Sequence, residues 1–365
     1  MLSAPSFTKP QIISHLSTTL DFTPFCTEWI PLSARITVCG SSINGNGVIE
    51  IYNINETQLN KQARYTFDSA IKCSTYSASN TTDRYLTTGD YMSNLCIIDI
   101  NNQKSSTPTV LYHTKVNKND SIINCIDGIG GLNGGQPIEL AAATKYNVAV
   151  YDIRQSDAVV NINSDRGAGR DCWSVAFGNS TQSSDRYLAC GYDNGDLKLF
   201  DLRINKFRYE CNIGNGIVSI QFDRNDIAVN KLLVTTLENK FTIFDMRTMN
   251  PTSGYTYQSY PAQHSNTTVW TGTHTPQNRD IFSTTGGNGS MNVWKYNYPT
   301  QRRITDTDGT QRGVCGTVQQ LCPTNKLAEQ PIVSFDWNKE KNGLFCMCSL
   351  DGVLQTGIVT RLNTV

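Results

Sequence analysis

The sequence predicts an all-β fold, a single seven-bladed β-propeller whose last blade is closed by an N-terminal strand. Three observations lead to this prediction. A hairpin pattern occurs seven times in the 365 residues, its copies lie about one blade length apart, and no segment shows the sustained 3.6-residue apolar periodicity of a helix.

The hairpin pattern is clearest in residues 186–203. Two apolar runs, 187–190 and 197–200, flank Asp193-Asn194-Gly195. Asn-Gly favours the positive φ angles that a tight turn requires, so this stretch predicts a β-hairpin. The second strand of the same pattern recurs at residues 47–53, 94–99, 147–152, 240–245, 290–295 and 352–358.

The residue that ends each of these strands marks the length of the repeat. The markers are Asn53, Asp99, Asp152, Asp201, Asp245, Lys295 and, by alignment, Ile358. Most of them are spaced slightly more widely than the roughly 40–45 residues of a four-stranded blade, as loop insertions would produce. We expect one domain, residues 1–365, with blades at about 25–55, 70–100, 121–154, 171–203, 216–247, 267–321 and 331–359.

Residues 9–16 read as a strand that precedes the first blade. After the hairpin strand at 353–358, residues 360–365 alone remain to supply a fourth strand for blade seven. A strand from the N-terminus that pairs there removes both the deficit and the open sheet edge. We therefore expect residues 11–16 to complete blade seven.

Two insertions interrupt the blades. Residues 127–137 form a glycine-rich loop in blade three, but no Gly-Lys-Ser/Thr follows and no helix opens there, so we predict a surface loop and no phosphate site. Between 297 and 330 we expect an outer strand at 317–321, preceded by a polar loop at 299–315 that carries three arginines.

Composition limits the classes of function. Lys plus Arg number 31 and Asp plus Glu also 31, so no global field would attract nucleic acid or a membrane surface. The 12 cysteines are scattered, many of them inside apolar strands, which favours buried reduced thiols in a cytoplasmic protein. No zinc spacing, signal core or membrane-length apolar run occurs, so we predict no metal site and no cofactor.

No catalytic constellation stands out, so we predict that the protein is not an enzyme. The four histidines do not cluster, and Gly-x-Ser-x-Gly is absent. His264 precedes blade six, where we expect a structural hydrogen bond to Thr284 or Thr285.

Asp-x-Arg ends three of the hairpin strands, at 152–154, 201–203 and 245–247. In the first interpretation, Asp and Arg bond neighbouring groups within the blade. In the second, they resemble the WD-x-Arg boxes of cullin-ligase substrate receptors, with Arg203 and Arg247 as adaptor contacts. Tyr151, Phe200 and Phe244 stand where those boxes carry Trp.

The repeats identify a WD40-type propeller, and several stretches outside the repeat pattern resemble one family, the Monad-type WD-repeat dynein axonemal assembly factors. The resemblance runs from about Lys9 to the C-terminus. The stretches that carry it are Lys9-Pro10-Gln11-Ile12-Ile13, residues 123–132, Arg170-Asp171-Cys172-Trp173, residues 175–179, Cys190-Gly191-Tyr192-Asp193-Asn194-Gly195-Asp196, and Phe241 with Phe244-Asp245-Met246-Arg247.

This resemblance implies a non-enzymatic cytoplasmic adaptor, here expected to be a monomer. It would work with prefoldin-like and RuvB-like ATPase co-chaperone subunits during preassembly of axonemal dynein heavy chains, and members of the family have been connected with apoptosis. The alternative is a substrate receptor of a cullin-type ubiquitin ligase.

Loops that enter the blades, together with the hairpin turns, are the expected interaction face. An aromatic residue flanked by arginine is typical of a binding hot spot. The alternative is that Trp173 belongs to the core and Asp171 caps a turn. The candidate residues are Lys72 of blade two, Asn124 and Asp127 of blade three, and Arg170, Asp171 and Trp173 of blade four.

Overall fold

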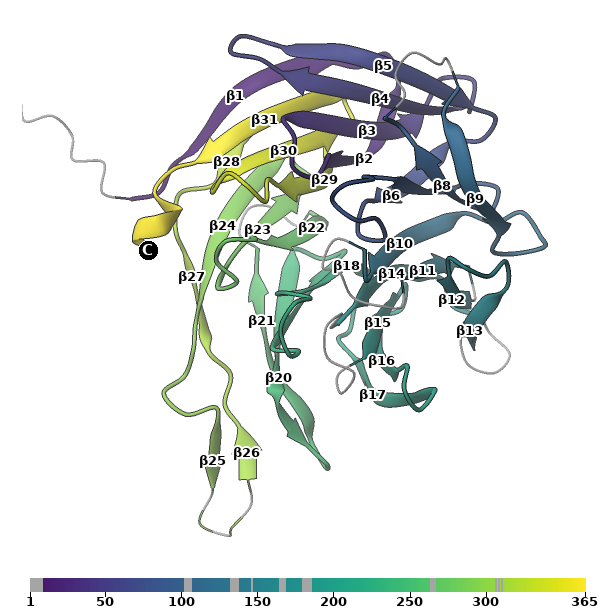
Figure 1. Cartoon of the computed structure of the whole chain (residues 1–365). Coiled ribbons are helices and arrows are strands. Elements are labelled where there is room, and N and C mark those ends of the chain that lie inside the picture. Colours follow the sequence, from purple (N-terminus) through teal and green to yellow (C-terminus); the bar gives the residue numbers. More distant parts are fainter. Residues whose placement is uncertain are drawn as a thin grey trace, which may run out of the picture.

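Seven antiparallel sheets surround a central axis and form a β-propeller, as the sequence predicts (Figure 1). The structure is a computed structural model, and it describes residues 9–101, 107–131, 138–145, 147–163, 169–178, 186–262, 267–305, 307, 309 and 311–365. The predicted Asn194-Gly195 turn is present, with Gly195 at φ +86°. Its amide donates a hydrogen bond to the carbonyl of Tyr192 at 3.1 Å.

Blades 1 to 4 each consist of four strands, with the strand nearest the axis first in sequence. Blade 1 holds β2 (Thr23–Trp29), β3 (Arg35–Ser41), β4 (Gly47–Ile54) and β5 (Leu59–Phe67). Blade 2 holds β6 (Ile71–Thr75), β7 (Leu86–Asp90), β8 (Asn94–Asp99) and β9 (Thr109–Lys115). Blade 3 holds β10 (Ile123–Ile129), β11 (Glu139–Thr144), β12 (Asn147–Asp152) and β13 (Ala158–Asn163). Blade 4 holds β14 (Cys172–Phe177), β15 (Tyr187–Tyr192), β16 (Asp196–Asp201) and β17 (Lys206–Asn212).

Blades 5 to 7 follow the same plan with additions. Blade 5 holds β18 (Ile217–Phe222), β19 (Lys231–Thr236), β20 (Lys240–Asn250) and β21 (Gly254–Pro261). Blade 6 holds β22 (Val269–His274), β23 (Ile281–Gly286) and β24 (Ser290–Asn297), whose outer edge pairs with β27 (Thr317–Gln320) and β28 (Asn325–Lys326). Blade 7 holds β29 (Ile332–Trp337), β30 (Leu344–Ser349), β31 (Val353–Val359) and β1 (Ile12–Thr19), and a short 3-10 turn follows at Leu362–Thr364.

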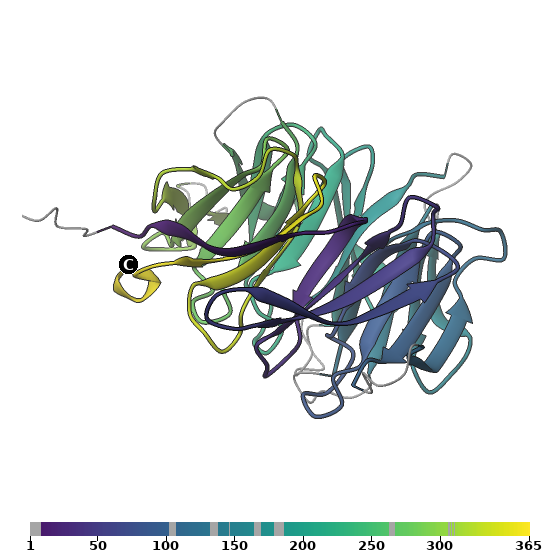
Figure 2. The same cartoon turned by 90° about the horizontal axis from the view of Figure 1, so that it is seen from above.

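The N-terminal strand closes blade 7, and this prediction is confirmed. Strand β1 runs antiparallel to β31, from the pair Ile12 and Val359 to the pair Thr19 and Val353 (Figure 2). It extends further than the expected 11–16. Beyond its far end, the Leu20 amide donates to the carbonyl of Gly352 at 2.7 Å, so the pairing continues to the turn between β30 and β31.

The core lies between neighbouring blades, where their facing sides pack together. In one cluster, Leu197 and Leu199 of β16 pack with Ile217 and Val234 of blade 5. The approach is close at Gly191, because a Cβ there would lie 2.4 Å from the Ile217 side chain. Tight apolar contact of this kind makes the ring a single rigid unit.

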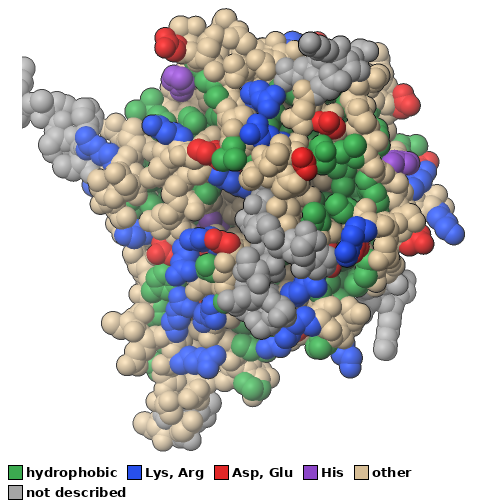
Figure 3. All heavy atoms as spheres, viewed as in Figure 1, with side chains coloured by type: hydrophobic (Ala, Val, Ile, Leu, Met, Phe, Trp, Pro, Cys, Tyr) green, Lys and Arg blue, Asp and Glu red, His purple; other side chains and the backbone are tan. Residues whose placement is uncertain are grey.

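The blade 6 insertion is more ordered than the expected polar loop. It forms a hairpin of β25 (Arg303–Thr305) and β26 (Gln311–Gly313) that lies against the long strand β20. The Asn250 side chain donates to the carbonyl of Gln311 at 2.7 Å, and Arg303 donates to the carbonyl of Arg247 at 2.9 Å. Basic side chains gather over this part of the face in the space-filling view (Figure 3).

Candidate interaction site at the mouth of the central channel

Each inner strand carries a β-bulge near its N-terminal end, and the bulge lies at the same place in all seven blades. In β6, for example, the register with β7 shifts between Ile71 and Cys73, so Lys72 is the extra residue. A bulge redirects a side chain that would otherwise follow the pleat. The seven bulge residues are Phe25, Lys72, Asn124, Trp173, Val218, Trp270 and Val333.

A short sequence pattern accompanies these bulges. In each inner strand the bulge residue follows a buried residue and precedes Cys, Ser or Thr, as in Ile71-Lys72-Cys73 and Val269-Trp270-Thr271. The bulge residues themselves are all partly exposed. They line one end of the channel, which we call the mouth, around a cavity of about 470 Å³.

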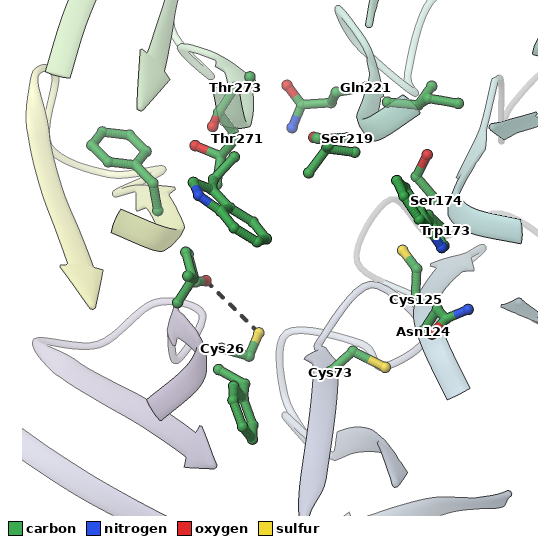
Figure 4. A pocket seen from close by; sticks show the side chains of 18 of the residues that line it. Cys26, Cys73, Asn124, Cys125, Trp173, Ser174, Ser219, Gln221, Thr271 and Thr273 are labelled. Atoms are coloured by element: carbon green, nitrogen blue, oxygen red, sulfur yellow. Dashed lines mark hydrogen bonds between the residues drawn. The ribbon is translucent and has the colours of Figure 1, made fainter. Parts of the chain in front are cut away.

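Below the mouth, the Cys, Ser and Thr positions form a second ring of side chains. Figure 4 shows Cys26, Cys73, Cys125, Ser174, Ser219 and Thr271 around the opening. Several of these side chains bond the backbone of the next blade. The Cys73 thiol donates to the carbonyl of Ile123 at 3.5 Å, and the Ser174 hydroxyl donates to the carbonyl of Ile217 at 3.4 Å.

The thiols of this ring are protonated at neutral pH. Burial and the Glu28 carboxylate raise the pKa of Cys26 to about 12, and burial raises the pKa of Cys125 to about 11. Burial also holds the pKa of Cys73 well above its usual range. Because the thiolate is the nucleophile and the metal ligand, these cysteines are poorly suited to either role.

The opposite end of the channel is lined by acceptors. The carboxylates of Glu28, Asp127 and Asp336 and the amide oxygen of Gln221 each accept a hydrogen bond from a backbone amide of the next blade. The Tyr76 amide donates to Glu28 of blade 1 at 3.2 Å, and the Phe177 amide donates to Asp127 of blade 3 at 2.8 Å. The Trp29 amide donates to Asp336 of blade 7 at 2.9 Å, and the His274 amide donates to Gln221 of blade 5 at 2.6 Å. These bonds link four pairs of neighbouring blades at their inner strands.

Burial of this end shifts the pKa values of its ionisable groups. Burial and the nearby Asp336 carboxylate raise the pKa of Glu28 to about 8. Burial raises the pKa values of Asp127 and Asp336 to about 6 and lowers that of His274 to about 4. Uncharged forms are favoured because the channel wall solvates charge poorly.

The mouth has a different electrostatic character. Of the twenty residues that line its cavity, Lys72 is the one Lys, Arg, His, Asp or Glu. Its ammonium lies 5.1 Å from the centroid of the Phe25 ring, within range of a cation–π contact. It makes no ion pair with any residue in the described ranges.

The structure divides the six residues predicted for the interaction face among three places. Lys72, Asn124 and Trp173 are bulge residues and lie together at the mouth. Asn124 donates to the carbonyl of Cys172 at 2.9 Å, which links blades 3 and 4. Asp127 lies three residues further along β10, about 10 Å away at 3.3 Å per residue, and faces the opposite end.

Arg170 and Asp171 lie just before β14, outside the mouth cavity. Arg170 is exposed, and Asp171 is partly buried. The backbone of Asp171 forms an isolated antiparallel β-bridge with that of Lys145 in blade 3. The Asp171 carbonyl also accepts a hydrogen bond from the Asp193 amide at 3.0 Å. Burial raises the pKa of the Asp171 carboxyl. This pair therefore belongs to the rim between blades 3 and 4.

The Asp-x-Arg motifs bond mainly within their own blades. Arg203 donates to Asp201 at 3.1 and 2.7 Å, and the Arg154 guanidinium holds the pKa of Asp152 at about 2. In blade 5, Asp245 instead pairs with Arg302 at 3.4 Å, while the Arg247 guanidinium donates to the carbonyl of Ala228 at 3.3 Å.

Two aromatic residues of the mouth, Phe25 and Trp270, were not singled out by the sequence reasoning. Both could have been found by aligning the seven inner strands on the buried residue and the Cys, Ser or Thr that follows. His264 and residues 132–137 of the glycine-rich loop lie outside the described residues. Thr284 accepts a hydrogen bond from the Trp294 indole at 2.9 Å, and Thr285 donates to the carbonyl of Ile332 at 3.1 Å.

The described residues hold neither a metal-binding cluster nor a membrane-spanning helix. No group of three or more His, Cys, Asp and Glu side chains there could hold a metal ion. Nor do the described elements include a helix with the length and hydrophobicity that a bilayer crossing requires.

Comparison with known proteins gives full-length matches. The chain is 44% identical over 360 residues to dynein axonemal assembly factor 10 of Xenopus laevis, covering 97% of this chain and 98% of that protein. The protein of the same name from Homo sapiens is 43% identical over 365 residues, with 99% of both chains covered. That from Chlamydomonas reinhardtii is 40% identical over 361 residues, with 98% of this chain and 99% of that protein covered.

The fold also has solved counterparts. The β-propeller domain of Cps50 (Swd1) from Myceliophteria thermophila superposes with a TM-score of 0.68, covering 96% of this chain and all of that one. Its sequence identity is 12%, so this likeness concerns the fold alone. No protein-family model matches the chain.

Proposed function

The chain belongs to the dynein axonemal assembly factor 10 family, and on that premise we propose that it is a non-enzymatic scaffold for the assembly of axonemal dynein. In detail, it assists the preassembly of dynein arms in the cytoplasm together with a co-chaperone complex of prefoldin-like and RuvB-like ATPase subunits. Dynein heavy chains are its clients, and it acts as a monomer.

One observation carries this proposal. Proteins named dynein axonemal assembly factor 10 from an alga, a frog and a human match the chain over 97% of its length or more, at 40 to 44% identity. The alignments span nearly the whole of both chains, so they include the segments between the strands, and in a propeller the surface loops carry much of the function.

The chemistry of the channel supports a role in binding. The thiols of its second ring are protonated, and the carboxylates at its far end are occupied by backbone amides of neighbouring blades. Carboxyl groups engaged in these hydrogen bonds stabilise the contacts between blades. The mouth instead presents aromatic side chains and one ammonium group, which suit recognition of another protein.

The test is a pull-down of the tagged protein from the cytosol of a cell that is building cilia, with mass spectrometry of the bound proteins. We expect dynein heavy chains, RuvB-like ATPases and prefoldin-like subunits. Recovery of a cullin and its adaptor instead, lost in the double variant Arg203→Ala and Arg247→Ala, would contradict the proposal and favour a ligase receptor.

A further inference from the structure

We propose that the mouth of the channel binds an extended peptide segment of a partner protein in which a carboxylate stands next to a large apolar side chain. The inference rests on the proposed scaffold function, because a protein engaged in dynein assembly would supply the segment. It extends the proposed function by naming the chemical class of peptide that the mouth binds.

The ring of bulge residues has a polar arc and an apolar arc. Lys72 and Asn124 come from the adjacent blades 2 and 3. Trp173, Val218, Trp270 and Val333 follow in blades 4 to 7, and Phe25 of blade 1 completes the ring. With seven blades in a circle, blade 2 lies opposite blades 5 and 6. An extended chain across the mouth can therefore direct an acidic side chain to Lys72 and an apolar one to Val218 and Trp270.

The apolar arc is concave and large enough for side chains. Leu237 extends its wall and is 39% exposed, and the cavity of about 470 Å³ is within the roughly 300–1,000 Å³ of typical ligand pockets. Tryptophan is enriched among residues that dominate binding energy, because it buries a large area and keeps a polar N–H. Neither Trp173 nor Trp270 donates its indole N–H to another residue of the described chain, so both are available to peptide carbonyls.

The polar arc selects the charge of the ligand. Lys72 projects an ammonium into a site whose other lining residues are uncharged, and it has no acidic partner among the described residues. A carboxylate brought to this position gains a charge-assisted hydrogen bond in a partly desolvated site. A cationic peptide meets repulsion there, so one lysine determines specificity as well as affinity.

Nucleic acid fits the mouth less well than an acidic peptide. A single ammonium neutralises one phosphate, whereas polyanion binding needs several basic groups along the backbone path. The chain as a whole has a net charge of zero. Exposed aromatic residues alone favour stacking, so a single-stranded oligonucleotide serves as the competing ligand in the test.

The experiment begins with a random 12-residue peptide display library selected on the whole protein. We expect enrichment of Asp or Glu next to Leu, Ile, Phe or Trp. The selected peptide, labelled with fluorescein, is then titrated by fluorescence anisotropy. Lys72→Glu and Trp270→Ala should each weaken binding at least tenfold. Lys118→Glu is the matched control, because Lys118 is exposed in the loop that enters blade 3, outside the cavity, and it should leave affinity within twofold.

Reversing the charge of both the peptide and residue 72 tests whether these two groups contact each other. A peptide with Lys in place of its Asp or Glu should bind Lys72→Glu better than it binds the wild-type protein, and thermal unfolding checks that each variant is folded. Selection of basic peptides or none, an unchanged affinity in Lys72→Glu, or tighter binding of a dT12 oligonucleotide would overturn the inference.

The pull-down separates this inference from the proposed function. If wild-type protein recovers dynein heavy chains but selects no acidic peptide, the inference fails and the scaffold function stands. If acidic peptides bind through Lys72 but no dynein or co-chaperone subunit is recovered, the proposed function fails and the peptide site stands.

Discussion

The two ends of the central channel are built from the same seven strands, yet they differ in what their side chains do. At the mouth, Lys72, Trp173 and Trp270 line the cavity. Neither indole N–H is hydrogen-bonded to a described residue, and the Lys72 ammonium contacts the Phe25 ring but forms no ion pair with a described residue. At the opposite end, Glu28 and Asp127 are bonded to backbone amides of the next blade. These three side chains at the mouth are therefore available for binding, whereas the carboxyl groups at the opposite end hold neighbouring blades together.

This difference follows position along each inner strand, which carries a bulge at its mouth end. The bulge adds one residue before the alternation of side chains resumes, so the residue at the bulge and the residues after it face different surroundings. Substitutions at one end should change stability and leave binding intact, and substitutions at the other end should do the reverse. The predictions below test that separation.

The largest effect is expected from removing residues 1–20, because this exposes the edge of β31 and leaves blade 7 with three strands. The truncated protein should be insoluble, or its melting temperature should fall by more than about 5 °C, as loss of a whole strand's pairing and packing implies. Thermal unfolding of the purified protein measures this. Unchanged melting would show that blade 7 does not need β1.

Asp127→Ala should destabilise the protein by about 2–4 kcal/mol. It leaves the amides of Phe177 and Gly128, which both donate to Asp127 at 2.8 Å, without their acceptor. Urea unfolding at pH 7 measures the loss, and Asp127→Asn, which keeps one acceptor, should lose less. Weaker peptide binding at the mouth in a folded Asp127→Asn protein would contradict the separation of the two ends.

The free energy of unfolding should fall as pH rises from 6.5 to 8. The native protein holds a proton on Glu28, whose pKa is raised to about 8, while the unfolded chain has already released it. Glu28→Gln should remove about 1–2 kcal/mol of this fall. His274 opposes this fall only slightly, because its lowered pKa keeps it neutral in the native state, while the unfolded imidazole, half protonated at pH 6.5, loses its remaining charge over the same window.

Denaturant unfolding at several pH values measures the slope. Glu56→Gln is the control, since Glu56 is exposed in the loop between β4 and β5. A slope that is the same in Glu28→Gln and in the wild type would show that Glu28 is ionised in the native state.

The smallest effect on stability is expected at the mouth. Trp270→Ala should change the free energy of unfolding by less than about 1 kcal/mol, because its side chain is partly exposed and bonds no neighbouring blade. Urea unfolding alongside Asp127→Ala gives a direct comparison. A loss as large as that of Asp127→Ala would mean that the mouth also supports the ring.

The sequence was sufficient for the architecture because the second strand of the hairpin recurs seven times at blade spacing. Asn194-Gly195 adds a local turn signal in blade 4, where Gly195 has a positive φ. The closing strand was predicted because too few residues follow 358 to give blade seven its fourth strand. The hairpin at β25 and β26 could not be predicted in this way, because contacts with Asn250 and Arg247 of blade 5 help to hold it.

The candidate site was predictable in part. Lys72, Asn124 and Trp173 were found because each opens a blade. Asp127 was grouped with them because the sequence reasoning treated residues 127–137 as a loop, whereas Asp127 lies inside β10, three residues beyond Asn124. The position of the bulge that marks the mouth could not be predicted, because a bulge is a property of pairing between two strands.

The pairing of β1 with β31 has a consequence for how the protein is made. Strand β1 leaves the ribosome long before β31, and the pair Ile12 and Val359 is separated by nearly the whole chain. Until β31 has been synthesised, the backbone groups of β1 lack their pairing partner. Contacts between residues this distant in sequence also form slowly. Completion of the ring therefore depends on translation reaching its last blade, so a nascent chain that stalls before β31 is left with an open edge and is a substrate for chaperones or degradation.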